Sequence, residues 1–133
     1  MAQLATRNKI FSDLDMDFDI HPNTKKLNIL SGDVAVSRSL RNLIMTNHYD
    51  RKFHPEIGCN IRDSLFDHIL DSTALTISNS IIEVVNNFEP RVQLDGVRVV
   101  ADPDRNRYNV NIRYFIINEP EARTLTTFLE RIR

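Results

Sequence analysis

The alternation of apolar and polar residues between Tyr108 and Ile117 constrains the fold of this chain more than any other feature. One face of this stretch is apolar or aromatic and the other is polar: Tyr108, Val110, Ile112, Tyr114 and Ile116 against Asn109, Asn111 and Arg113. A period of two is typical of a β-strand with one buried face. A preceding strand is predicted over residues 92–101, and the turn-rich segment 102–107 joins the two. The sequence therefore predicts a β-hairpin with a six-residue loop.

Helical periodicity dominates the segment before this hairpin. A first helix is predicted after Gly32, with Ser31 or Asp33 as its N-cap. A short second helix is predicted over residues 61–70. A third helix is predicted from an N-cap at Ser72 or Thr73 to Pro90, because a proline ring pushes the preceding residue out of the helical region. The core faces of the first and third helices carry these apolar residues: Val36, Leu40, Leu43 and Ile44, then Ile77, Ile81, Val84, Val85 and Phe88.

The two ends of the chain are less regular. Residues 13–20 alternate aspartate with apolar residues, which predicts an extended segment that lays one apolar edge on the body of the protein. The C-terminal segment 119–133 fits a helical stripe and, through its threonines, also an extended strand. The expected class is α+β, with two to three N-terminal helices packed on a small antiparallel β-sheet. Residues 1–30 are expected to form an N-terminal arm and residues 31–133 a single domain.

Length and charge narrow the function. A chain of 133 residues makes one domain, and its 17 basic and 18 acidic residues give a net charge of −1. So weak a field disfavours general binding to nucleic acid or to anionic membranes. No apolar run reaches the roughly 18 residues of a membrane span. Because a lone Cys59 cannot form an internal disulfide, we expect a reducing, aqueous compartment, or an assembly built in one.

No catalytic residue, metal site or cofactor is predicted. Four possible zinc ligands lie close in sequence: His48, His54, Cys59 and His68. Their spacings lack the short ligand pairs of structural zinc sites, and residues 13–24 lack the glycine and glutamate of a calcium loop. A glycosidase needs two carboxyl groups, one of them with a raised pKa. Four carboxyl groups are available, but nothing in the sequence singles out a pair: Glu56, Asp63, Glu83 and Glu89. We therefore expect a protein that is not an enzyme.

Two other features attract attention. The first is the loop Phe53–Cys59, in which Pro55 and Gly58 restrict the backbone, and which we expect Phe53, Leu65 and Phe66 to anchor to the core. The second is the corner Glu89-Pro90-Arg91, where an acidic residue ends a helix against the macrodipole. Arg91 either offers its planar fork to a carboxylate of a partner or forms an ion pair within the corner. The residues alone leave both alternatives open.

In their order and spacing, these motifs resemble a known family. They include Phe11-Ser12-Asp13-Leu14-Asp15, His21-Pro22, the helical segment 36–43, the loop 53–59 with Leu65-Phe66, and Asn87-Phe88-Glu89-Pro90-Arg91-Val92. The chain is similar to the small baseplate wedge proteins of contractile-tailed bacteriophages, the sheath initiators. Relatives of that family include a baseplate component of type VI secretion systems.

The resemblance implies a structural role in the virion, in a tail baseplate assembled in the host cytoplasm. It implies that Glu89, Pro90 and Arg91 bind the helical core bundle of the wedge scaffold subunits. It also implies that the following residues form the loop motif of the family: Phe53, Pro55, Glu56, Gly58, Cys59, Leu65 and Phe66. The tail sheath protein is implied as a second partner, with the tail tube or neighbouring baseplate subunits as further ones.

Because the family's sheet resembles the interlocking domain of sheath subunits, the resemblance implies strand pairing with the first sheath ring. The residues implied for it are Val97, Val99, Tyr108, Val110, Ile112, Tyr114 and Ile116, and this use favours a strand for the C-terminal segment. The alternative is a peptidoglycan-cleaving, lysozyme-like glycosidase, a label that such proteins have carried. A small adaptor that captures a regulatory protein is a third class.

Overall fold

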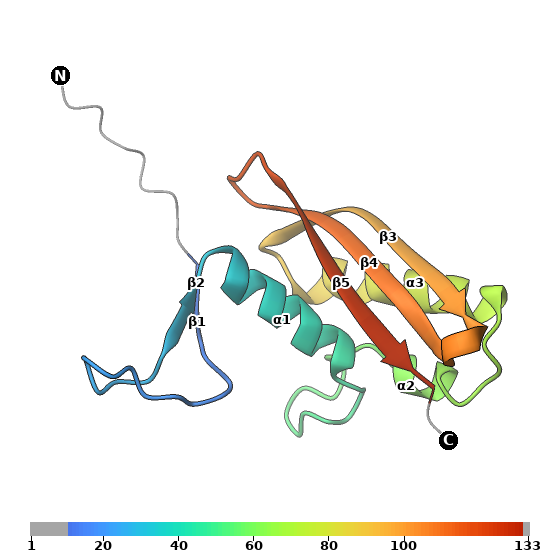
Figure 1. Cartoon of the computed structure of the whole chain (residues 1–133), viewed down its shortest axis with the longest axis horizontal. Helices are drawn as coiled ribbons and strands as arrows, with labels where there is room; N and C mark the ends of the chain where they lie inside the picture. The colour runs from blue at the N-terminus through green and yellow to red at the C-terminus, as the bar shows by residue number, and fades with distance from the viewer. Residues whose placement is uncertain (1–10, 132–133) are drawn as a thin grey trace.

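Helices packed on one face of a three-stranded antiparallel sheet form the body of the chain, and a small hairpin projects from it (Figure 1). The computed structural model describes residues 11–131. In chain order the elements are β1 (Ser12–Leu14), β2 (Ile29–Ser31), α1 (Asp33–Met45), α2 (Ile61–Ser64), α3 (Asp71–Phe88), β3 (Val92–Asp102), the 3₁₀ turn η1 (Pro103–Arg105), β4 (Arg107–Ile116) and β5 (Ala122–Glu130). The predicted α+β class is confirmed. Predictions for residues 1–10 and 132–133, including Ile132 in the helical stripe, lie outside the described residues.

The helix starts differ from the predicted caps. Helix α1 follows Gly32, whose φ of 66° makes the turn out of β2, and no side chain caps it. Asp33 instead forms an ion pair with Arg123 of β5 at 3.1 Å. Helix α3 starts after Leu70, again without a side-chain cap, so the caps predicted at Ser72 or Thr73 are wrong. No side-chain cap marks either start, so capping residues in the sequence could not locate them.

Helix α2 is shorter than predicted, because it ends at Ser64 rather than near Leu70. Beyond it the chain runs irregularly to α3 and contacts β4. The hydroxyl of Tyr108 accepts a hydrogen bond from the Leu70 N–H at 3.3 Å and donates one to the His68 carbonyl at 3.4 Å. A buried tyrosine needs such partners for its hydroxyl. The backbone groups of His68 and Leu70 supply them, in the irregular segment that follows α2.

The sheet order is β3-β4-β5, with both neighbours antiparallel to the central strand. The alternation predicted for β4 is confirmed, because all five residues of its apolar face are buried: Tyr108, Val110, Ile112, Tyr114 and Ile116. The C-terminal segment forms β5, which excludes the helical alternative for the described residues. A bulge interrupts the β3–β4 register between Leu94 and Gly96, whereas the β4–β5 register is continuous.

The core lies between the sheet and the helices. Its buried residues from α1 and α3 meet the apolar face of β4: Val36, Leu40 and Ile44, then Ala74, Ile77, Ile81, Val84 and Val85. Each helix therefore presents the predicted stripe to one common layer of side chains. The polar residues of β4 lie on the opposite face of the sheet and outside this layer, as expected for a sheet with one buried face.

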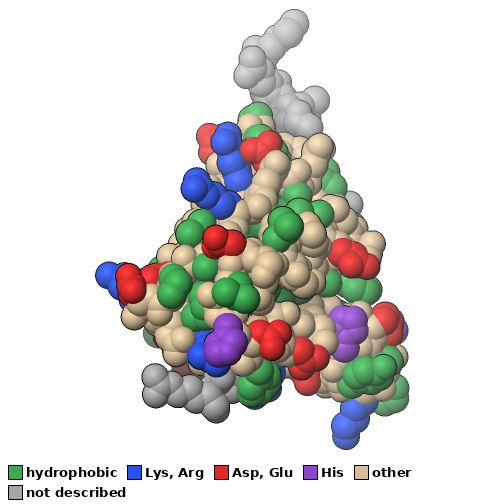
Figure 2. All heavy atoms as spheres, turned by 90° about the vertical axis from the view of Figure 1, so that its right-hand side faces the viewer, with side chains coloured by type: hydrophobic (Ala, Val, Ile, Leu, Met, Phe, Trp, Pro, Cys, Tyr) green, Lys and Arg blue, Asp and Glu red, His purple; other side chains and the backbone are tan. Residues whose placement is uncertain are grey.

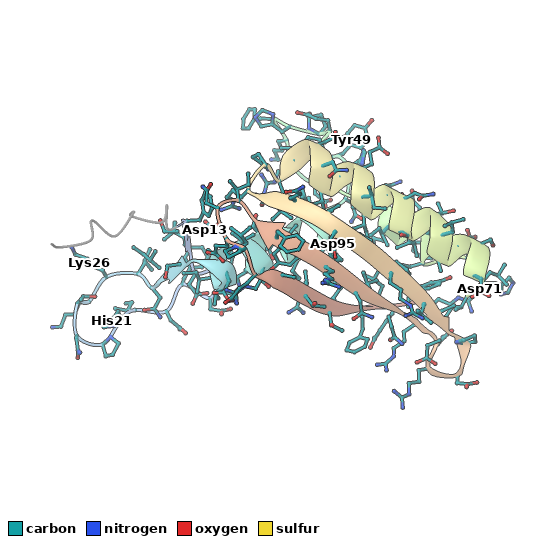
Figure 3. All side chains as sticks on the ribbon, turned by 90° about the horizontal axis from the view of Figure 1, so that it is seen from above. Asp13, His21, Lys26, Tyr49, Asp71 and Asp95 are labelled. Carbon is teal, nitrogen blue, oxygen red and sulfur yellow. The ribbon has the colours of Figure 1, made fainter. Side chains whose placement is uncertain are left out.

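The arm departs from its prediction. The apolar residues Leu14, Met16, Phe18 and Ile20 are 51–66% exposed, so they are not buried as an apolar edge. A turn in which the Phe18 N–H donates to the Asp15 carbonyl at 3.1 Å ends the extended stretch after Leu14. Phe11 packs against the core, Asp15 forms an ion pair with Arg38 of α1, and Asp17 binds the same guanidinium at 2.9 Å. Figure 3 shows His21 and Lys26 on the loop of the arm, away from the sheet.

Candidate assembly interfaces

The corner Glu89-Pro90-Arg91 joins α3 to β3 (Figure 1). Helix α3 ends at Phe88, and the Glu89 N–H donates to the Val85 carbonyl at 3.0 Å as the last helical bond. The Val92 N–H then donates to the Glu89 carbonyl at 3.2 Å, which closes a tight turn around Pro90. Pro90 itself is exposed at this turn. The corner is therefore a rigid turn with an exposed proline at its tip.

A buried ion pair holds the corner together. Arg91 donates two hydrogen bonds to the carboxylate of Glu89, from Nε at 2.7 Å and from Nη2 at 2.8 Å. Ser39 of α1 donates a third at 2.6 Å. Glu89 is 4% exposed and Arg91 is 23% exposed. Of the two alternatives for Arg91, the structure shows the internal ion pair, so the fork is already occupied by Glu89.

These contacts decide the charge of Glu89. Burial by itself raises the pKa of a carboxyl group, but the hydrogen bonds from Arg91 and Ser39 and the nearby positive charge outweigh burial and lower the pKa of Glu89 below its ordinary 4.5. Glu89 is thus an ionised structural group. Ser39 was not singled out by the sequence, since it lies fifty positions away from Glu89 and only the packing of α1 on α3 joins them.

A groove runs beside the corner and has a volume of about 810 Å³. The exposed Pro90 forms part of its wall. Its apolar lining comes from the arm, α1, the loop and the end of α3: Met16, Leu43, Met45, Ile57 and Phe88. Asp13, labelled in Figure 3, lies at the base of the arm and also lines the groove. We call this the corner groove; it joins the corner to Ile57 of the loop 53–59, and none of the seven loop-motif residues lines it.

The loop motif is only partly placed as predicted. Cys59 and Leu65 are buried, but Phe53 is 92% exposed and Phe66 is 54% exposed, so the expectation that both phenylalanines anchor the loop is wrong. Backbone contacts hold the loop instead. Gly58 has a φ of 138°, and a Cβ there would lie 2.6 Å from the Thr46 carbonyl oxygen. The Tyr49 N–H also donates to the Pro55 carbonyl at 3.0 Å. Because backbone hydrogen bonds hold the loop, the side chains of Phe53 and Phe66 are not needed as anchors and lie at the surface.

The chemistry of the remaining candidates does not favour catalysis. Glu56 is exposed, and hydrogen bonds from its own backbone N–H and from His54 lower its pKa despite some desolvation. A glycosidase acid needs the opposite shift, and Glu89 also has a lowered pKa. Burial raises the pKa of the Cys59 thiol to about 12, so it is a poor nucleophile. Within residues 11–131 no group of three metal-ligating side chains comes together.

No helix of the described chain is long and apolar enough to cross a membrane. On the face drawn in Figure 2, acidic, basic and apolar side chains are interspersed. That view therefore shows no large surface of one charge sign of the kind that nucleic-acid binding favours.

The sheet has one interrupted and one continuous edge. Strand β4 lies in the middle, so both of its backbone edges are occupied and the residues predicted there for sheath pairing serve the core. The edge of β3 contains the bulge, and its Val97 carbonyl already accepts a hydrogen bond from Ser78 of α3 at 3.4 Å. Bulges blunt an edge against added strands. An added strand therefore finds its best edge on β5.

The hydrogen-bond register identifies the free groups of β5. The Arg131 N–H donates to the Asn106 carbonyl at 3.0 Å, and the register continues without a bulge from Glu130 to Ala122. In an antiparallel pair, hydrogen-bonded and non-hydrogen-bonded positions alternate. The residues whose backbone N–H and C=O point away from β4 are consequently Thr124, Thr126, Phe128 and Glu130. The threonines were a signal for a strand, but not for its position at the edge.

Two solved structures share this fold. A chain in the 6-fold symmetrised cryo-EM structure of the anti-feeding prophage (AFP) baseplate has a TM-score of 0.64 at 23% identity, covering 93% of this chain and 88% of that one. A tail-lysozyme candidate from Geobacter sulfurreducens, solved as a crystal structure, has a TM-score of 0.72 at 24% identity, covering 80% of this chain and 97% of that one. At these identities the matches show the fold alone.

Sequence similarity shows the family. The model of the baseplate wedge protein gp25 family matches residues 30–121. The baseplate wedge protein gp25 of Enterobacteria phage T4 is 33% identical over 118 residues, which cover 89% of each chain. The chain therefore belongs to the baseplate wedge protein gp25 family, as the sequence motifs suggested.

Proposed function

We propose that this protein is a structural subunit of a phage tail baseplate, which docks on the wedge scaffold through the corner groove and starts the tail sheath at the edge of β5. Its membership in the baseplate wedge family is the observation that carries the proposal. The place of action is the baseplate of the virion, with assembly in the host cytoplasm. The tail tube and neighbouring baseplate subunits are further partners.

In the proposed docking, the corner contacts the partner through Pro90 and the groove rather than through the charge of Arg91. Since Glu89 satisfies the fork of Arg91, the two charged residues set the shape of the corner, and the exposed Pro90 and the apolar lining of the groove meet the partner. An amphipathic helix binds such a groove through its apolar stripe. One helical turn of about 10 Å diameter occupies roughly 420 Å³, so the groove of about 810 Å³ has the capacity for part of a helix of the scaffold bundle.

Copurification with the wedge scaffold subunits of the same phage tests docking. The Met16→Glu variant places a charge in the groove at an exposed position and spares the core. Leu75→Glu is the matched control, because Leu75 is also exposed but lies on α3 outside the groove. Size exclusion with light scattering should show a complex for the wild type and the control and a lost or weakened complex for Met16→Glu. An equally stable complex with all three proteins contradicts docking through the groove.

Strand addition at β5 supports the second part of the proposal. Backbone groups at the edge of a sheet are satisfied by an extended chain, and the outward groups of Thr124, Thr126 and Phe128 form such a row over a continuous register. The first sheath ring would supply the extended chain. Val97 and Val99 on β3 retain a supporting role only, since their core-facing side chains pack on the central cluster.

The Thr126→Pro variant tests strand addition. Proline removes the outward N–H of an edge strand without removing a bond to β4. Baseplates assembled with this variant should carry no sheath or short sheaths in electron micrographs, whereas Thr126→Ala should support sheaths of normal length. Circular dichroism must first show that the proline variant is folded. Normal sheaths on a folded proline variant would remove β5 from the mechanism.

A further inference from the structure

A small apolar pocket opens beside the last residues of β5. Its volume is about 220 Å³. The end of α1, the segment around α2 and the end of β5 supply its apolar lining: Ile44, Met45, Ile61, Leu65 and Leu129. Asn47 and Arg62 complete the lining. The pocket is separate from the corner groove, although Met45 borders both. No contact described so far uses it.

Leu129 connects the pocket to the free edge of the sheet. Its side chain is 3% exposed and lies on the core face, while its backbone pairs with Tyr108 of β4. The residues on either side, Phe128 and Glu130, turn their backbone groups outward. Directly opposed residues of neighbouring strands place their side chains on the same face of the sheet. A residue of an added strand opposite Leu129 therefore points its side chain toward the face on which the pocket lies.

We propose that this pocket takes one apolar side chain of the strand that adds to β5, and so selects which segment of the sheath subunit can add. The inference rests on the proposed strand addition and specifies its partner: an extended segment with an aliphatic or aromatic residue opposite Leu129.

The size and chemistry of the pocket support this occupant. A dry cavity of about 150 Å³ accepts benzene, so 220 Å³ accommodates a leucine, isoleucine or phenylalanine side chain. A lysine ammonium in the same place would lose its hydration and meet the like charge of Arg62. The edge of β5 supplies backbone hydrogen bonds that any sequence can form, and the pocket adds the side-chain selection that such bonds lack.

Peptide binding tests the assignment. Overlapping peptides of about 15 residues, long enough to span an edge strand, tile the tail sheath subunit of the same phage and carry a fluorescent label. Each is titrated with the full chain by fluorescence anisotropy. Lysine is then placed at each position of the peptide that binds. Lysine at one apolar position should weaken binding at least about tenfold, and lysine at the adjacent positions, which face the other side of the sheet, should weaken it far less.

A change in the pocket should change the preference for the peptide. Leu65→Ala enlarges the pocket and should favour a peptide with a larger apolar residue at the sensitive position, by about tenfold relative to the wild type. Leu75→Ala, at an exposed position of α3, is the matched control and should leave the preference unchanged. If Leu65→Ala is unfolded by circular dichroism, Ile61→Val makes a smaller enlargement and should shift the preference in the same direction.

Two results overturn the inference. A bound peptide that tolerates lysine at every position has no side chain in the pocket, and strand addition at β5 then still stands. Failure of every peptide to bind also removes the pocket as a selective site. In that case the sheaths formed on Thr126→Pro baseplates report separately on strand addition, so the two failures are distinguishable.

Discussion

Replacement of Arg91 by alanine tests whether the ion pair at the corner is structural. In the wild type, Arg91 donates two hydrogen bonds to a carboxylate that is 4% exposed. Alanine leaves that carboxylate with the hydroxyl of Ser39 as its remaining side-chain donor. Breaking a buried pair by removing one partner costs about 3–5 kcal/mol. Because Arg91 is itself 23% exposed, we expect a loss near the lower end, about 3 kcal/mol in the free energy of unfolding.

The loss should depend on pH. The folded pKa of Glu89 lies below its ordinary value of 4.5, so the pair stabilises the folded state above pH 4.5, and this stabilisation is lost as the pH falls through the folded pKa. In the variant, burial without Arg91 favours the protonated carboxyl group. The difference in stability between wild type and variant should therefore be largest near neutral pH and shrink below pH 4.5.

Urea denaturation followed by circular dichroism measures this difference. The matched control is Arg113→Ala, which removes an exposed ion pair with Asp95 and should cost about 0–1 kcal/mol with little change between neutral and acid pH. The reasoning is refuted if Arg91→Ala costs no more than Arg113→Ala at neutral pH, or if its cost is the same on both sides of pH 4.5. Arg91→Glu is a poor probe of docking, since it sets a second carboxylate against the buried Glu89.

Three further outcomes follow from single contacts. Gly58→Ala should lower the free energy of unfolding by more than about 1 kcal/mol, because the residue has a φ of 138° and its Cβ would lie 2.6 Å from the Thr46 carbonyl oxygen. Thermal or urea unfolding measures this loss, Gly96→Ala at an open site is the control, and equal losses would contradict the steric argument. Arg38→Ala removes the ion pairs to Asp15 and Asp17, so limited trypsin digestion should cut the arm at Lys25 or Lys26 faster than in the wild type. An unchanged cleavage rate would mean that these ion pairs do not hold the arm. The Cys59 thiol should resist alkylation at mildly alkaline pH in the native protein and react in urea, because burial raises its pKa to about 12. Rapid alkylation of the native protein would contradict this burial.

Local patterns predicted the elements with a strong period. The alternation in β4 revealed which residues enter the core, because a strand with one buried face must alternate. Pro90 revealed the end of α3 for a similarly local reason. The C-terminal segment was ambiguous, since Leu125 and Leu129 satisfy both periods, and its pairing with β4 decides for the strand.

Long-range contacts decided what local patterns left open. The period of residues 13–20 predicted a buried apolar edge, but its apolar residues are more than half exposed, and Asp15 and Asp17 form ion pairs with Arg38 of α1. Phe53 looked like an anchor until the backbone bonds around Gly58 proved sufficient to hold the loop. A period of two states which residues share a face and does not state which face meets the core.

The sequence by itself determined the α+β class, the apolar faces of the main helices and of β4, and the family. These depend on local periodicity and on the order of short motifs, which a linear chain displays directly. Only the tertiary structure decided that Glu89 binds Ser39, that β5 presents the free edge, and that Leu129 borders a pocket beside it. Each of these joins residues distant in the chain, and their meeting depends on how the helices pack on the sheet rather than on any neighbouring residue.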